Sequence, residues 1–220
     1  MLIRILDDFQ RDPTQAIITL AAFSFSLVIA ITVHEFSHAL AALNPAAHLD
    51  PVGTALIFFA GFGWGKPTPV NPFLFLRISP RQGMALVSMA GPISNIVVAS
   101  LFAIPIRAGL VDPGGFGFGL FGESANDIAD VILINMVFWN LLLATFNLLP
   151  IAPLDGFKVV LGILPPESAR GFARLEQYGP GILMMTIMLE YILPGPGILS
   201  SFINPILNLL TTVVLGGQVL

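Results

Sequence analysis

Long apolar stretches alternate with short polar connections along the chain. Residues 16–43 form the first stretch, about 28 residues long, and its only ionisable side chains lie together at positions 34, 35 and 38. Residues 84–106 and 131–154 contain no charged side chain. Because a helix needs about 20 apolar residues to cross a bilayer, each of these three stretches predicts a transmembrane helix.

The C-terminal part of the chain contains two further apolar segments. Residues 181–193 carry one charge, Glu190, and residues 197–220 carry none. Prolines at positions 194 and 196 separate the two segments, because proline breaks a helix. We therefore expect an all-α multi-pass membrane protein with about five transmembrane helices, four and six being the alternatives.

The segment between the first two predicted helices, residues 44–81, has a different composition. Proline at this density excludes a continuous helix, yet residues 52–64 are as apolar as a membrane span. Irregular backbone at that depth must be covered by protein. We expect a re-entrant extended loop or a short β-hairpin, with an interfacial loop as the alternative. The prolines are Pro45, Pro51, Pro67, Pro69, Pro72 and Pro80.

The overall composition agrees with a membrane protein. The chain is 55% hydrophobic and only 10% charged, which is too apolar for an ordinary soluble domain. A formal net charge of −4 leaves no basic surface for nucleic acid. Without an internal repeat, residues 1–220 are expected to form one membrane-embedded domain, with a core at 16–164 and C-terminal helices at 181–220.

The ionisable side chains of the first span form the motif His34-Glu35-Phe36-Ser37-His38. Positions four apart share one face of a helix, so both imidazoles can bind one zinc ion while Glu35 acts as general base toward water. The alternative is a set of polar residues bonded to neighbouring helices. Because ionisable residues at bilayer depth are costly and usually functional, the motif favours a metal site.

A catalytic zinc usually has three protein ligands, so a third ligand is needed besides the two histidines. Because the chain has no cysteine, this ligand must be an imidazole or a carboxylate. Helix direction places the motif and Asp155 on the same side of the bilayer, whereas the acids of residues 112–130 lie about 30 Å away on the other side. The remaining candidates are His48, Asp50, Asp155 and Glu190.

Asp155 has the most distinctive setting of these candidates. Pro150 and Pro153 interrupt the helix before it, and Gly156 permits a tight turn that directs the carboxylate inward. The alternative is that Asp155 caps the next helix near Lys158. The role of His48 stays open between a further metal contact, a residue that gates the site and a hydrogen-bonded loop histidine.

Basic residues are more frequent on the side of the membrane that carries the motif. This excess predicts a cell-membrane protein whose active site lies nearer the cytoplasmic face. The side of the motif has Lys66, Arg77, Arg81, Lys158, Arg170 and Arg174, and the other side has Arg4, Arg11 and Arg107.

Three motifs together resemble the site-2 protease family, whose members are zinc metalloproteases that cut peptide bonds within or beside transmembrane segments. They are residues 34–38, residues 90–95 with the sequence Ala-Gly-Pro-Ile-Ser-Asn, and residues 147–156, which match Asn-x-x-Pro-x-x-Pro-Leu-Asp-Gly. The likeness covers residues 16–164, and residues 48–53 and 65–72 resemble the compact bacterial branch that lacks a PDZ domain.

The resemblance implies one Zn²⁺ per chain, bound by His34, His38 and Asp155, with Glu35 as the catalytic base. Asn95 and Asn147 are then expected to line the site or to bind an oxyanion. The expected partners are a transmembrane protein or peptide as substrate and the lipid bilayer, without nucleic acid, while the oligomeric state is left open.

Two other functions are compatible with a metal site in a membrane. A zinc transporter would line a path to both faces with polar groups, but residues 84–106 and 131–154 offer mainly serine and asparagine. A non-catalytic zinc-binding scaffold would be expected to have lost Glu35 or one of the ligands, and all are present. The sequence therefore favours an intramembrane zinc metalloprotease.

Overall fold

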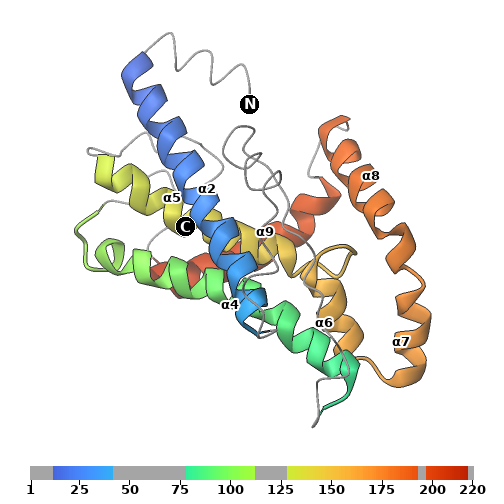
Figure 1. The fold of residues 1–220 in the computed structure, drawn as a ribbon. Coiled ribbons are helices and arrows are strands. Elements are labelled where there is room, and N and C mark those ends of the chain that lie inside the picture. Colours follow the sequence, from blue (N-terminus) through green and yellow to red (C-terminus); the bar gives the residue numbers. More distant parts are fainter. Residues whose placement is uncertain (1–11, 42–77, 112–127, 193–196, 218–220) are drawn as a thin grey trace.

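The computed structural model describes residues 12–41, 78–111, 128–192 and 197–217. All regular elements within these ranges are helical, which confirms the all-α prediction (Figure 1). The predicted loop or hairpin falls largely on residues 42–77, outside the described part of the chain. The elements are α2 (Pro13–Ala41), α4 (Pro80–Arg107), α5 (Ile128–Asn147), α6 (Asp155–Ile163), α7 (Pro166–Ala173), the 3-10 helix η3 (Glu176–Tyr178), α8 (Gly179–Ile192) and α9 (Ile198–Leu215).

Four of these helices, α2, α4, α5 and α9, are long and apolar enough to cross a membrane. The remaining predicted span, residues 181–193, corresponds to α8, which has only 14 residues. At 1.5 Å per residue it is about 21 Å long, shorter than the hydrocarbon core of about 30 Å. The structure therefore favours the four-span alternative for the part of the chain it describes.

Helix α4 lies at the centre of the bundle and contacts α2, α5, α6 and α9. In Figure 1, α2 crosses α4 and α5. Helix α4 begins sharply because Ser79 and Gln82 form a capping box and Pro80 occupies the first helical position, where its missing N–H costs nothing. Its position between α2 and α6 brings together two segments that are distant in sequence.

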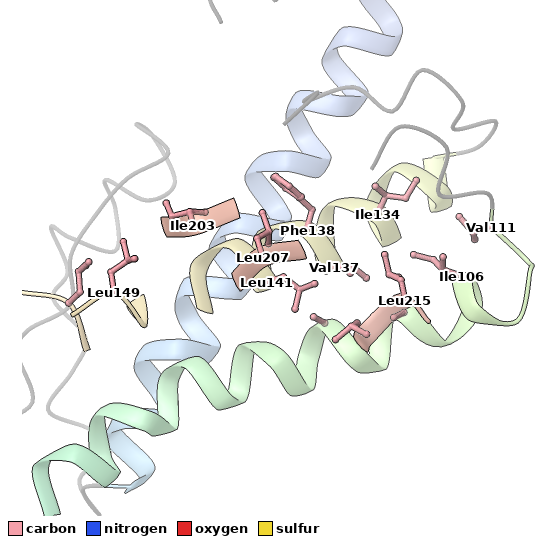
Figure 2. Packing of buried hydrophobic residues seen from close by; sticks show 14 residues of the cluster. Ile106, Val111, Ile134, Val137, Phe138, Leu141, Leu149, Ile203, Leu207 and Leu215 are labelled. Carbon is pink, nitrogen blue, oxygen red and sulfur yellow. The ribbon is translucent and has the colours of Figure 1, made fainter. Parts of the chain in front are cut away.

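The apolar core lies between α4, α5 and α9 (Figure 2). Ile106, Val137, Leu141 and Leu215 are almost completely buried there. Ala99 and Ala103 on α4 are also fully buried, and their small side chains allow α5 to pack closely. This core holds α4 and α5 together beside the polar site described below.

The third predicted span ends earlier than its apolar composition indicates. Helix α5 stops at Asn147, and residues 148–154 form turns before α6 begins at Asp155. Pro150 and Pro153 lack the backbone N–H that a continuing helix requires. The break allows α6 to change direction and pack against α4.

Candidate metal centre

Helices α2 and α6 bring three potential metal ligands together. His34 and His38 lie one turn apart on α2, and Asp155 is the first residue of α6. The Nε2 atoms of both imidazoles are 3.0 Å from Asp155 Oδ2 and 3.1 Å from each other. All three residues are buried. The three ligand atoms therefore converge on one point.

The outer nitrogens of both imidazoles contact carbonyl oxygens. His34 Nδ1 is 2.6 Å from Asn95 Oδ1, and His38 Nδ1 is 2.8 Å from the backbone oxygen of Val87. Because a carbonyl oxygen only accepts hydrogen bonds, each Nδ1 carries the proton and donates it. In the neutral imidazoles, each Nε2 then presents a bare lone pair toward Asp155.

The charge of Asp155 completes the donor set. Asp155 is the one acidic group among the three converging side chains. Its position in the first turn of α6 also suits a negative charge. Two imidazole lone pairs and a carboxylate oxygen within 3.1 Å of one another need a cation between them, and this donor set fits zinc.

The turn before α6 depends on Gly156. A Cβ atom at this position would collide with the backbone carbonyls of Leu148 and Leu149. The backbone after α5 therefore approaches the start of α6 more closely than a residue other than glycine at position 156 would allow. This close approach holds Asp155 beside α2.

Comparisons with known proteins agree with this donor set. The chain is 36% identical over 170 residues to the protein named "Putative zinc metalloprotease YwhC" from Bacillus subtilis, and the match covers 70% of this chain and 74% of YwhC. The chain belongs to the YwhC family. No family model matches the chain, and no solved structure matches it.

The proteins of the same type named Rip2 are more distant relatives. Rip2 of Mycolicibacterium smegmatis is 28% identical over 75% of this chain and 67% of its own length. Rip2 of Mycobacterium tuberculosis is 27% identical over 73% of this chain and 64% of its own length. These names support the zinc metalloprotease part of the resemblance seen in the motifs.

Glu35 and the two predicted site asparagines have different surroundings. Glu35 is partly buried on α2 and does not belong to the group of converging ligand atoms. Asn95 lies behind His34, and its amide nitrogen donates to Ala30 O and to Asn140 Oδ1. Asn147 Nδ2 donates to Leu143 O at the end of α5. Both N–H groups of Asn95 are thus used within the protein.

Glu190, another candidate for the third ligand, does not belong to this group of atoms. Glu190 accepts hydrogen bonds from the backbone N–H groups of Leu199 and Ser200, at 2.7 and 3.0 Å, and from the Ser200 hydroxyl. It therefore caps the N-terminus of α9 from α8. His48 and Asp50 lie outside the described residues.

Sequence reasoning missed groups that contact the site residues, among them the Val87 carbonyl and the Asn140 amide. The Val87 carbonyl, which accepts from His38, could not be found because every residue has a backbone carbonyl. Asn140, which accepts from Asn95, left a weak signal, since it is a buried amide in an uncharged apolar stretch. That Asn140 bonds to Asn95 on α4 can be known only from the folded structure.

Gly91 provides the space in front of the two imidazoles. A Cβ atom added there would lie 2.5 Å from His38 Nε2 and 2.6 Å from His34 Nε2, on the side of the rings where a metal would bind. We expect Gly91→Ala to lower zinc affinity by at least the roughly 10- to 100-fold typical of altered metal-site surroundings, measured by competition with a chelator.

The matched control for this prediction is Gly171→Ala on α7, where an added Cβ meets no atom within 4 Å. Its zinc affinity is expected to equal that of the wild type. Equal affinities for Gly91→Ala and wild type would show that the ligand atoms do not converge beside Gly91.

Proposed function

We propose that this protein is an intramembrane zinc metalloprotease of the site-2 protease type. The observation that carries the proposal is the convergence of His34, His38 and Asp155 beside Glu35. These ligands lie on or next to helices that are apolar enough to cross a membrane. A zinc-binding scaffold would need the ligands but not the adjacent carboxylate.

The roles of the residues follow from their positions. His34, His38 and Asp155 would hold a zinc ion, which would supply the Lewis acidity that polarises the scissile carbonyl and lowers the pKa of water. Glu35 takes the proton from the attacking water and passes it to the leaving amine. The carbonyls behind the imidazoles hold both rings with Nε2 toward the metal.

The proposed substrate is a membrane-anchored protein or peptide. A helix in lipid bonds all its peptide groups internally, so the substrate must unwind locally before a carbonyl is available to water. The excess of basic residues on the side of the motif supports a site nearer the cytoplasmic face. Cleavage is therefore proposed in the cytoplasmic part of the substrate span.

The test is cleavage of single-span substrates by the purified full-length chain in detergent, with zinc removed and then restored. We expect a chelator to abolish cleavage and a stoichiometric amount of Zn²⁺ to restore it, because the metal completes the donor set. Fragment masses from a substrate of known topology, co-expressed in cells, locate the cut bond.

Three results would contradict the proposed activity, and a fourth would contradict the proposed orientation. Full activity after zinc is removed to below the detection limit would exclude a zinc protease. Zinc-loaded protein that cleaves none of a panel of single-span substrates would favour the scaffold, and zinc flux in proteoliposomes would favour the transporter. A cut in the outer half of the substrate span would contradict the proposed orientation alone.

A further inference from the structure

A chain of hydrogen bonds runs from His34 into the interior of the bundle. Asn95 Oδ1 accepts from His34 Nδ1 at 2.6 Å, Asn140 Oδ1 accepts from Asn95 Nδ2 at 2.8 Å, and Met136 O accepts from Asn140 Nδ2 at 2.8 Å. Asn95 and Asn140 are both 0% exposed. The chain thus connects α2 to α5 through α4 without contact with solvent.

Backbone carbonyls fix the direction of every hydrogen bond in this chain. Met136 O accepts only, so the amide of Asn140 must turn its Nδ2 toward it and its Oδ1 toward Asn95. Asn95 Nδ2 also donates to Ala30 O at 2.9 Å. Reversing either amide would bring two buried oxygens together and leave N–H groups unpaired, which costs about 1–3 kcal/mol for each group.

This direction determines which nitrogen of His34 carries the proton. Asn95 can offer His34 only an oxygen, so Nδ1 is protonated and the lone pair lies on Nε2, the atom that faces His38 and Asp155. We propose that Asn140 is a positioning residue that, together with the Ala30 carbonyl, holds His34 in its metal-binding tautomer and ring orientation through Asn95. The role in metal binding rests on the proposed function, whereas the role in setting the tautomer does not.

The second imidazole provides an internal reference. His38 Nδ1 contacts the backbone oxygen of Val87, which no side-chain substitution removes. An effect that travels through Asn140 and Asn95 should therefore change His34 and leave His38 as it is. A general loosening of the bundle would change both rings.

Asn135 offers a matched control on the same helix. Its Nδ2 donates to Val131 O at 2.8 Å and its Oδ1 accepts from Trp139 Nε1 at 3.1 Å, so it makes the same type of bonds away from the site. Asn135 is also buried, at 7% exposed. Leucine at either position removes one buried amide from α5, but only Asn140→Leu cuts the chain to His34.

The experiment compares Asn140→Leu and Asn135→Leu in the full-length protein by two measurements. Zinc affinity is measured by competition with a chelator. The ¹⁵N shifts of the imidazole rings are measured in zinc-free protein, and the sequence has only three histidines to assign. We expect Asn140→Leu to lower zinc affinity about 10- to 100-fold and to give His34 a mixture of tautomers. Asn135→Leu and the ring of His38 should remain close to wild type.

A double-mutant cycle tests the path of the effect. In an Asn95→Ala background, Asn140→Leu should add little further loss of zinc affinity, because the chain is already cut. If Asn140→Leu does not fold, Asn140→Thr replaces it in the experiment. A threonine hydroxyl on a helix can donate to the carbonyl four residues earlier, as Thr145 does to Leu141 O on α5. It keeps the local bond but withdraws the acceptor from Asn95.

The outcomes separate this inference from the proposed function. Equal zinc affinities for Asn140→Leu and Asn135→Leu, or an unchanged His34 tautomer in Asn140→Leu, would overturn the inference. Absence of zinc binding in the wild type would overturn the proposed function. The tautomer measurement on the zinc-free protein would still test the role of Asn140.

Discussion

Replacing Glu35 with glutamine is expected to lower the cleavage rate by about 10²- to 10⁴-fold, the range for loss of a general base. Zinc content should stay at the wild-type level, because Glu35 is not among the three converging ligands. Glutamine keeps the size of the side chain but cannot take a proton from water. The measurement is cleavage of a single-span substrate together with zinc per chain by mass spectrometry.

The control for Glu35→Gln is Glu167→Gln, which removes the same charge from an exposed position on α7. Its cleavage rate and zinc content should both match the wild type. If Glu35→Gln retained most of its turnover with zinc bound, Glu35 would not be the base. If the variant lost zinc, Glu35 would be part of the metal site instead.

Local patterns were enough to predict the spans that have continuous apolar sequence. Charge-free composition located α4 and α5, and the apolar run with one ionisable motif located α2. Apolar composition alone extended the third span to residue 154, whereas α5 ends at Asn147. The interruption that Pro150 and Pro153 predicted before Asp155 is confirmed by the turns at residues 148–154. The shortness of α8 also changes the expected number of spans from five to four in the described part of the chain.

The candidate ligands were accessible from sequence because helical spacing links His34 to His38 and helix direction places Asp155 on the same side. The surroundings of these ligands were not accessible in the same way. Asn95 was expected to line the site or bind an oxyanion, but its two N–H groups bond to α2 and α5. Such a role depends on where three helices meet, and no local pattern encodes that meeting point.

Substitution of Asp155 should have the largest effect on the metal. We expect Asp155→Asn to lower zinc affinity by more than about 100-fold, beyond the range for residues that only surround a metal site, because it removes the one anionic ligand of the three. The side chain keeps its size, and Gly156 still permits the turn into α6. Cleavage should fall with zinc occupancy and recover partly at high zinc concentration.

The control for Asp155→Asn is Asp130→Asn. Both residues lie in the first turn of a helix, Asp130 in α5 and Asp155 in α6, so both substitutions remove a favourable interaction with a helix N-terminus. Only Asp155 contacts His34 and His38. Equal zinc affinities for the two variants would show that Asp155 does not bind the metal and serves only the N-terminus of α6.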